Sequence, residues 1–421
     1  MVQPRKKLIV IGGGAAGFFC AINAARMNPG LEVVILEKTK KLLSKVRISG
    51  GGRCNVTHSC FDIDEMSKKY PRGNNFVKKS FHQFFTKDTI SWFEQRGVKL
   101  KTENDGRIFP STNSSQTIID VLLREADRYN VAIRLNSEAR KIDIELGKAD
   151  NVRTFVVACS DGELLQADYL CIASGGYPKP QMFEWLTKLG HSIEEPVPSL
   201  FTFNMPQHPI TGLMGVSVEH ARVKIAGTKS EQEGPLLITH WGLSGPAVLK
   251  LSAWAARQLA LSNWQFPVLI NWLPHYNEQS LQKDFQRLRL ELASQKIANK
   301  NPFGLPNRLW EFFLNEIDVK EEMRWADLPA KTQSKLVRLL CAYPADIKGK
   351  TTFKEEFVTA GGIRLNEIDA NTMMSRKISN LFFAGEVMDV DGITGGFNFQ
   401  HAWSSGFIAA RTIEKLSQYE A

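Results

Sequence analysis

Residues 7–17 read Lys-Leu-Ile-Val-Ile-Gly-Gly-Gly-Ala-Ala-Gly, and the next apolar run ends at Glu37. A buried strand that turns directly into a helix needs residues without a Cβ at fixed positions. Gly12 permits the turn, Gly14 lets the backbone approach a pyrophosphate, and Gly17 brings the helix onto the strand. The helix N-terminus attracts phosphates, and Glu37 can accept hydrogen bonds from both ribose hydroxyls of an adenosine. This spacing predicts a dinucleotide-binding site.

A targeting segment is the alternative interpretation of the N-terminus, because three basic residues, 5–7, precede the nearly uncharged stretch 8–25. A signal sequence has no need for glycines at the dinucleotide spacing, and residues 26–30 are typical of a helix end. No other stretch is long and apolar enough to span a bilayer. The six cysteines are scattered, and several lie inside apolar runs, as reduced core cysteines do. We therefore expect a cytoplasmic protein that does not enter a membrane.

The chain has 421 residues, enough to bury a large core in two or three domains. Its 53 Lys and Arg against 44 Asp and Glu give a net charge of +9 and a pI near 9.1. This charge suits an anionic cofactor or substrate and also permits nucleic acid. The basic residues between 38 and 47 are interpreted as a solvated face beside the phosphate site. Nucleic acid is therefore not the partner we expect, and an RNA role is kept as an alternative.

The first half of the chain alternates helical and strand patterns, as α/β proteins do. Helices are expected at 16–27, 87–96 and 116–129. Strands are expected at 31–36, 132–134, 139–144, 152–159, 164–167 and 169–173. The last of these is buried and stops on Ser174-Gly175-Gly176, small residues that let its carboxyl edge meet a ligand.

Composition changes at 194–198, where two prolines mark a linker. Short strands are expected beyond it at 200–204, 216–218, 222–225 and 236–239, followed by helices at 280–297, 307–317 and 331–340. The pattern returns to a strand at 351–357. We therefore predict a discontinuous cofactor domain (1–195 and 351–421) and an insertion (196–350), β-rich over 196–270 and helical over 275–345.

The C-terminal segment carries the second strong pattern. A buried strand, 381–384, stops on Gly385-Glu386, and a glycine-rich acidic loop then leads to a helix expected at 399–416. This order resembles the way two-dinucleotide-domain flavoproteins close their FAD site. The resemblance implies that an acid after the strand holds the ribityl chain and that the helix N-terminus faces the pyrimidine end of the flavin.

A longer set of motifs narrows the resemblance to one family. The motifs are Ile48-Ser-Gly-Gly-Gly-Arg-Cys-Asn-Val-Thr57, Asp105-Gly-Arg-Ile-Phe-Pro110, Thr239-His-Trp-Gly-Leu-Ser-Gly-Pro246, Thr359-Ala-Gly-Gly362, Phe383-Ala-Gly-Glu386, Asp389-Val-Asp-Gly392 and Gly395-Gly-Phe-Asn398. Together they resemble the BaiN-like (YhiN-like) bacterial flavoproteins, some of which are called aminoacetone oxidase-like. The chain departs from that family after Gly176, where the family has a longer Ser/Thr/Gly-rich loop.

The resemblance implies an α/β fold: a Rossmann-like, two-dinucleotide-type FAD-binding domain split by an insertion with a β-barrel-like part and a helical part. It also implies an FAD-dependent oxidoreductase that reduces an activated double bond in an oxo-steroid or oxidises a small amine. The residues expected to contact FAD lie in the motifs above. They are Gly12, Gly14, Ala15, Ala16, Gly17, Glu37, Lys38, Lys45, Ser49, Gly51, Gly52, Arg53, Cys54, Asn55, Ala173, Gly175, Gly385, Glu386, Asp391, Gly395, Gly396, Phe397 and Asn398.

Two residues are catalytic candidates. Cys54 could be a redox-active thiol beside the flavin, although a small packing residue is favoured. A dithiol mechanism is not expected, because Cys60 lies one residue too far away for the usual spacing of disulfide-reducing flavoenzymes. His240 lies in a glycine-rich loop and could transfer a proton, or simply be a hydrogen-bonded loop histidine. Arg53 is expected to position flavin or phosphate, with a surface arginine as the alternative.

The sequence therefore predicts hydride transfer between FAD and a small organic substrate, with no metal site. A second GxGxxG after a strand is absent from the middle of the sequence, so NAD(P)H would dock only transiently as electron donor. Two alternatives stay open: a flavin-dependent RNA-modifying enzyme, and a flavin-binding redox sensor without turnover. The sequence leaves open the substrate, the oligomeric state, and a covalent flavin link to His58 or His401.

Overall fold

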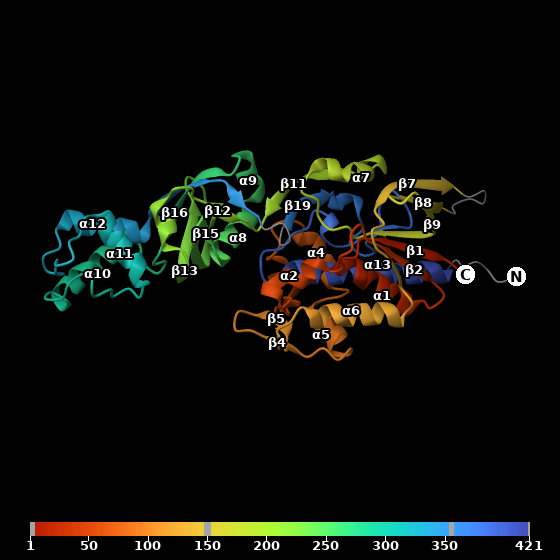
Figure 1. The fold of residues 1–421 in the computed structure, drawn as a ribbon, viewed down its shortest axis with the longest axis horizontal. Coiled ribbons are helices and arrows are strands. Elements are labelled where there is room, and N and C mark those ends of the chain that lie inside the picture. Colours follow the sequence, from red (N-terminus) through yellow and green to blue (C-terminus); the bar gives the residue numbers. More distant parts are fainter. Residues whose placement is uncertain (1–4, 147–152, 353–357, 420–421) are drawn as a thin grey trace. The chain divides into compact units, whose positions relative to one another are not determined.

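The computed structural model of the chain describes residues 5–146, 153–352 and 358–419. It divides into two compact units (Figure 1). Unit 1 comprises Met1–Pro198 and Phe353–Ala421, and unit 2 comprises Ser199–Thr352. Each unit is described by itself below.

A five-stranded parallel sheet forms the centre of unit 1, in the order β20-β10-β1-β2-β6. The strands are β1 (Lys7–Ile11), β2 (Glu32–Leu36), β6 (Ala132–Arg134), β10 (Tyr169–Ile172) and β20 (Leu381–Phe383). Leu8 pairs with Val33 on one side and with Tyr169 on the other, and all three are buried. Parallel strands all end at the same edge, so the turns after β1, β10 and β20 meet there.

Two long helices, α1 (Ala15–Met27) and α13 (Phe397–Tyr419), pack closely on each other in unit 1. Gly406 makes this approach possible, because a Cβ there would lie 2.7 Å from the carbonyl oxygen of Ala16. The strand β1 and helix α1 lie within residues 7–27, while β20 and α13 lie within residues 381–419. Both ends of the chain therefore build the same edge of the sheet.

The remaining elements of unit 1 surround this layer. Its helices are α2 (Ser44–Gly52), α3 (Ile63–Ser67), α4 (Asn74–Phe81), α5 (Thr86–Glu94), α6 (Gln116–Arg128) and α7 (Glu184–Lys188). Its smaller sheets are β3-β5-β4 (Thr57–His58, Arg107–Pro110, Leu100–Thr102), β7-β8-β9 (Ala139–Leu146, Arg153–Cys159, Leu164–Ala167) and β11-β19 (Ile193–Ser199, Val358–Ile363).

Unit 2 contains a seven-stranded sheet in the order β17-β16-β13-β14-β15-β12-β18, antiparallel at each pairing. Its strands are β12 (Thr202–Asn204), β13 (Ser217–Ile225), β14 (Glu231–Thr239), β15 (Gly242–Ser244), β16 (Gln265–Asn271), β17 (Tyr343–Lys348) and β18 (Lys350–Thr351). Its helices are α8 (Pro246–Trp254), α9 (Ala256–Leu261), α10 (Glu278–Glu291), α11 (Asn307–Glu316) and α12 (Ala330–Cys341).

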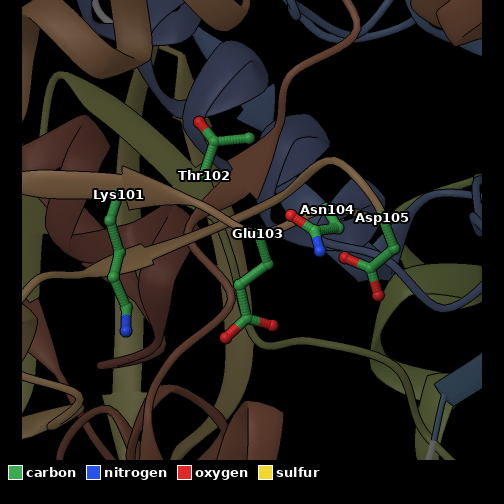
Figure 2. Close-up of a pocket in the computed structure, with 5 residues that line it drawn as sticks. All are labelled: Lys101, Thr102, Glu103, Asn104 and Asp105. Carbon is green, nitrogen blue, oxygen red and sulfur yellow. The ribbon is translucent and has the colours of Figure 1, made fainter.

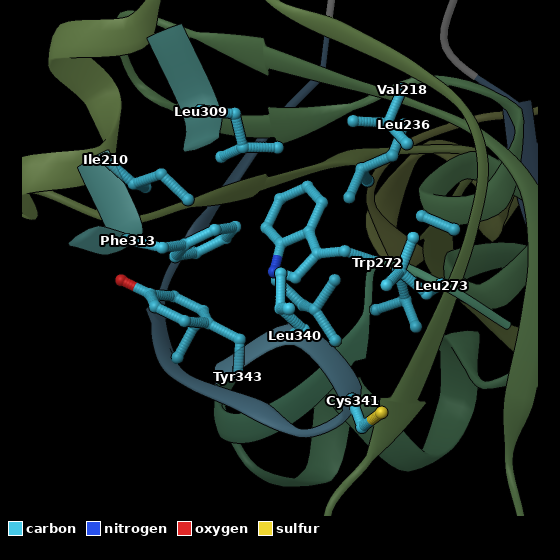
Figure 3. Close-up of a cluster of buried hydrophobic side chains, with 14 of the residues drawn as sticks. Ile210, Val218, Leu236, Trp272, Leu273, Leu309, Phe313, Leu340, Cys341 and Tyr343 are labelled. Atoms are coloured by element: carbon cyan, nitrogen blue, oxygen red, sulfur yellow. The ribbon is translucent and has the colours of Figure 1, made fainter. Parts of the chain in front are cut away.

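One hydrophobic core joins the sheet and the helices of unit 2. Figure 3 shows the indole of Trp272 among side chains that include Phe313 of α11 and Leu340 of α12. Trp272 is 1 % exposed, and Phe313 and Leu340 are fully buried. The helical segment and the β-rich segment of unit 2 therefore share a core instead of folding as separate layers.

The expected Rossmann-like α/β class is confirmed by the parallel sheet, while several element predictions need correction. The segments 216–218 and 222–225 are one strand, β13, interrupted by a bulge after Val218. The helix expected at 280–297 ends at Glu291, because the backbone of Ile297 bonds to Met323 instead of continuing the helix. The linker expected at 194–198 lies within the strand β11. The structure also contains five helices that were not predicted: α2, α3, α4, α8 and α9. Most of the strand expected at 351–357, and the start of the one at 152–159, lie outside the described residues.

Candidate functional site

The nucleotide end of the site is organised by Glu37, which follows β2. Its carboxylate accepts hydrogen bonds from the backbone N–H of Gly13 at 3.0 Å and from the N–H and hydroxyl of Thr39 at 2.9 Å each. These bonds fix the carboxylate beside the turn between β1 and α1. The neighbouring Lys38 ammonium lies 5.6 Å from the ring centre of Tyr177. The end of β2 therefore presents an oriented acid next to the N-terminus of α1, where Ala15 and Ala16 begin the helix.

The glycines of the predicted fingerprint fall into two groups. A Cβ at Gly12 would lie 2.3 Å from the carbonyl oxygen of Ala173, and one at Gly17 would lie 2.0 Å from that of Gly12. These two glycines are required by the packing of the chain on itself. A Cβ at Gly14 would meet nothing within 4 Å, and neither would one at Gly175 after β10. The turns after β1 and β10 thus border open space at the edge of the sheet.

The segment at the end of α2 also presents open backbone. Ser49 leaves helical geometry with a ψ of 146°, and Gly50, Gly51 and Gly52 all have positive φ, at 59°, 68° and 83°. Glycine adopts such angles without strain. A Cβ at Gly51 or Gly52 would meet nothing within 4 Å. The open glycines on the turns after β1 and β10 and on this segment leave backbone uncovered by protein side chains, as close approach of the extended phosphate and ribityl chain of FAD requires.

Arg53 is held by the protein itself. Its guanidinium donates to Glu103 Oε1 at 2.6 Å and lies 4.1 Å from the ring centre of Phe109. Glu103 lines a pocket at the hairpin between β4 and β5, which Figure 2 shows together with the side chains of residues 101–105. Arg107 also donates to Glu103, at 3.3 Å. The contact of Arg53 with FAD stays a prediction, and its neighbours show how the guanidinium is oriented.

Cys54 is fully buried, and burial raises the pKa of its thiol to about 12. Its backbone adopts a φ of 60° and its N–H donates to the carbonyl of Ser49 at 2.9 Å. A thiol with such a pKa is protonated at neutral pH and is a weak nucleophile. All six cysteines are free, so Cys54 and Cys60 form no disulfide here. The geometry supports the packing interpretation over the redox one.

Glu386 lies between two segments far apart in the sequence. Its carboxylate accepts hydrogen bonds from Lys45 Nζ at 2.5 Å and from the backbone N–H of Thr359 at 2.8 Å. Gly385 before it has a φ of 75°, and its N–H donates to the hydroxyl of Ser405 in α13 at 2.9 Å. The turn after β20 is therefore attached to α2, to β19 and to α13. The sequence did not predict the contact of Thr359 with Glu386, because Thr359 appeared there only within a family motif.

The loop before α13 is fixed by side chains that fold back on it. Asn398 both accepts from the N–H and donates to the carbonyl of Gly392, at 2.8 and 2.9 Å. The amide of Asn55 accepts from the N–H of Gly396 and donates to the carbonyl of Thr57, at 2.9 Å each. Gly395 and Gly396 have φ values of 138° and 93°. This bracing positions the first N–H groups of α13, which have no acceptor within the helix.

Asp391 and His401 are buried polar groups next to this helix start. Asp391 is fully buried and its carboxylate is paired with Arg72, a partner that no sequence motif indicated. Burial lowers the pKa of His401 to about 4, and its Nε2 lies 3.3 Å from the carbonyl oxygen of Gly385. Phe397 stacks on the half-buried ring of His58, with ring centres 4.9 Å apart. Direct contact of Asp391 and Phe397 with FAD stays a prediction.

His240 belongs to unit 2, at the turn between β14 and β15. Its exposed ring lies edge-on to Trp241, with ring centres 4.4 Å apart. Thr239 and Gly242 close the turn through a 3.0 Å hydrogen bond from the Thr239 hydroxyl. The residues predicted to contact FAD all belong to unit 1, and many of them follow β1, β2, β10 and β20 at the carboxyl edge of one sheet. Within the described residues, no group of three or more His, Cys, Asp or Glu side chains is arranged to hold a metal.

Fold and site together define the class of this protein: an FAD-dependent oxidoreductase with a Rossmann-type cofactor domain. The model of the HI0933-like protein Rossmann domain matches residues 6–412, and the chain belongs to this family. The resemblance to BaiN-like flavoproteins is thereby confirmed. In the part of the chain that the structure describes, no helix has the length and apolar character of a membrane span.

Three curated relatives align over nearly the whole chain. Two carry the name ribosomal RNA dihydrouridine synthase, from Escherichia coli (31% identity, 96% of this chain and 97% of the relative) and Haemophilus influenzae (30%, 97% and 98%). The third is the 3-dehydro-bile acid delta(4,6)-reductase of Clostridium scindens, with 26% identity over 96% of this chain and 97% of the relative. The expectation that nucleic acid is not a partner is therefore not confirmed.

Solved structures with low sequence identity share the fold. A flavocytochrome c3 fumarate reductase in an open conformation aligns with a TM-score of 0.51 and 16% identity, covering 99% of this chain and 79% of the other. The 3-ketosteroid-delta4-(5alpha)-dehydrogenase of Rhodococcus jostii RHA1 aligns with a TM-score of 0.50 and 13% identity, covering 97% and 98%. These likenesses support the architecture alone.

Proposed function

We propose that this protein reduces the C5=C6 double bond of a uracil base in ribosomal RNA, with NAD(P)H as the electron donor. The observation that carries the proposal is the pair of dihydrouridine synthases, which match at 31% and 30% identity over 97% and 98% of their own lengths. Because the alignment spans nearly all of both proteins, it includes unit 2 as well as the cofactor domain. The net charge of +9 suits a polyanionic substrate.

The chemistry implied by the names of all three relatives is of one type. Dihydrouridine differs from uridine by two hydrogens across a carbon–carbon bond next to a carbonyl, and a delta(4,6)-reductase acting on a 3-oxo compound saturates a double bond in conjugation with a carbonyl. Such a reduction adds a hydride to the carbon remote from the carbonyl and a proton to the other carbon. Bound FAD would supply the hydride from its reduced form, which the external donor would regenerate.

The residues of unit 1 would hold the cofactor for this reaction. Glu37 would accept the adenosine ribose hydroxyls, the backbone at Gly14 and the start of α1 would face the pyrophosphate, and Glu386 would bind near the ribityl chain. The first N–H groups of α13, positioned by Asn55 and Asn398, would stabilise negative charge at the pyrimidine end of the flavin. His240 stays our candidate for the proton donor.

The decisive experiment uses ribosomal RNA purified from cells that lack the gene. The holoenzyme is incubated with this RNA and either NADPH or NADH, and the nucleosides are quantified by mass spectrometry. We expect dihydrouridine to appear with at least one donor, and the variant Gly14→Ala, which we expect to lose FAD, to produce none. Absence of dihydrouridine with both donors, in protein that contains FAD, would overturn the proposal.

Reduction of an oxo-steroid is the second candidate function, and the Clostridium scindens relative favours it. A 3-oxo-4,6-diene steroid offered to the same holoenzyme separates the two functions. Steroid-dependent oxidation of NAD(P)H without any dihydrouridine would favour this second candidate. Neither product, with flavin that no donor reduces, would instead indicate a flavin-binding redox sensor.

His240 is tested separately by stopped-flow measurements on His240→Ala. We expect the reoxidation of reduced flavin by RNA to slow by about 10²-fold or more, as loss of a general acid does. Reduction by NAD(P)H should be unchanged. Unaltered reoxidation would remove His240 from the mechanism.

A further inference from the structure

Helix α12 of unit 2 carries three basic side chains in a row on one face. Lys331, Lys335 and Arg338 are separated by four and three residues, so they project from the same side of the helix along about 10 Å. All three are exposed, and the helix contains no acidic residue. We call these three residues the α12 basic stripe.

The opposite face of α12 packs into the hydrophobic core of unit 2. Leu336, Val337 and Leu340 are at most 3 % exposed, and Figure 3 shows Leu340 beside the indole of Trp272. The stripe therefore lies on the solvent side, directly away from the core. Since the apolar face is already buried, the helix has no second apolar face with which to enter a lipid surface.

The stripe does not contribute to holding unit 2 together. Among the described residues, none of its three side chains forms an ion pair or a side-chain hydrogen bond. The neighbouring helix α10 shows the contrast: Arg287 is bound to both Asp284 and Glu291, at 2.6 and 2.5 Å, and Arg289 donates to the carbonyl of Ala326 at 2.8 Å.

The stripe also works against the stability of its own helix. Lys331 is the second residue of α12, where the positive end of the helix dipole disfavours a cation. Lys331 and Lys335 are like charges four residues apart, a pairing that is mildly destabilising. The carboxylate nearest in sequence is Asp327, one turn before the stripe, and Glu278 lies near Cys341 at the other end of the helix. Arg338 lies in the last turn, where the dipole favours a cation, so the cost falls on Lys331 and Lys335, and these unpaired lysines point to an external anion.

We propose that the α12 basic stripe binds the phosphate backbone of the RNA substrate. The inference rests on the proposed function, because it assigns that substrate to one surface of unit 2. Unit 2 contains 18 Lys and Arg against 13 Asp and Glu, so its net charge of +5 supports binding of a polyanion. A row of flexible cations along a helix contacts successive phosphates without reading sequence. The stripe would thus supply affinity and orientation, while base selection occurs elsewhere.

The test compares two triple variants with the same loss of charge. Lys331→Gln/Lys335→Gln/Arg338→Gln removes the stripe, and Lys229→Gln/Lys300→Gln/Lys320→Gln removes three exposed lysines elsewhere in unit 2. Binding of a fluorescein-labelled oligouridylate is followed by fluorescence anisotropy across a range of salt concentrations. Melting temperature and FAD content verify that both variants fold, and we expect neither to be less stable than the wild type.

Removal of three phosphate contacts should reduce the slope of log K against log salt by about 2 and weaken binding about 100-fold at 0.1 M salt. The control variant should retain most of the wild-type slope. In addition, RNA should protect Lys331 and Lys335 from acetylation by an N-hydroxysuccinimide ester, detected by mass spectrometry. Equal salt slopes for the two variants would overturn the proposal. It would also be overturned if the stripe contributed to binding of phosphatidylserine vesicles or of an acidic protein but not to binding of RNA.

The outcomes also separate this inference from the proposed function. If the stripe variant forms dihydrouridine at the wild-type rate and has an unchanged salt slope, the proposed function is retained and the α12 basic stripe is not the RNA-binding surface. If RNA binding depends on the stripe but the wild-type protein forms no dihydrouridine, the RNA-binding surface is supported and the proposed reaction is refuted. A wild-type protein that binds no RNA would overturn both.

Discussion

Arg72 and Asp391 form a buried ion pair that ties the segment before α4 to the loop before α13. The Asp391 side chain is fully buried and that of Arg72 is 9 % exposed. The two residues are 319 positions apart in the chain. The pair therefore joins an N-terminal segment to the C-terminal loop whose glycines lead into the proposed flavin site.

Arg72→Leu should lower the free energy of unfolding by about 3–5 kcal/mol, because it leaves the Asp391 carboxylate buried without its partner. Urea denaturation monitored by circular dichroism measures this change. The matched control is Lys68→Leu, which breaks an exposed pair with Glu65 and should cost at most about 1 kcal/mol. Equal stability of the two variants would contradict a structural role for the buried pair.

The two groups of glycines predict opposite phenotypes. Gly14→Ala should fold with nearly the stability of the wild type, because its Cβ meets no protein atom within 4 Å, yet lose FAD because that space belongs to the cofactor. Gly12→Ala should be strongly destabilised, since its Cβ would lie 2.3 Å from the carbonyl oxygen of Ala173. Melting temperature of the apoprotein and flavin content after reconstitution distinguish the two. A Gly14→Ala protein that retains bound FAD would refute the assigned position of the pyrophosphate.

Cys54→Ser should keep bound FAD and most of the turnover. The thiol is buried and its pKa is raised to about 12, so it is not ionised at the pH of any ordinary assay. Flavin absorbance and steady-state rate are the measurements, and Cys60→Ser, at a partly exposed cysteine, is the control. Loss of turnover with FAD still bound would restore a redox role for Cys54.

His401 should make the protein less stable in mild acid. Its pKa is lowered by burial from 6.5 to about 4, so the unfolded chain takes up a proton in this range while the folded chain does not. The stabilising contribution is fully present above pH 6.5 and is lost as the pH falls toward 4. The loss of stability amounts to about 2 kcal/mol at pH 5. Urea denaturation at pH 7.5 and pH 5 should show a smaller difference for His401→Asn than for the wild type. The exposed variant His220→Asn is the control, and an equal pH effect in both variants would exclude this role.

The sequence by itself determined the dinucleotide fold, because the requirements there are local. A strand, three glycines, a helix and a terminal acid lie within residues 7–37, and a Cβ at Gly17 would lie 2.0 Å from the carbonyl oxygen of Gly12 in the same turn. The resemblance of its motifs to those of known flavoproteins indicated the family and the use of FAD. Periodicity located α1, α6, α11, α12 and α13 to within a few residues.

Only the tertiary structure decided which side chains meet. The pairing of Arg72 with Asp391, of Lys45 with Glu386 and of Arg53 with Glu103 joins residues whose sequence neighbours give no sign of the partner. Helix α2 escaped prediction because positive φ values at three glycines interrupt its periodicity. The α12 basic stripe could be counted in the sequence, but its lack of partners depends on what packs around the helix. The spacing of residues along the chain determines local backbone geometry, whereas charge pairing and burial depend on contacts between segments that are distant in the sequence.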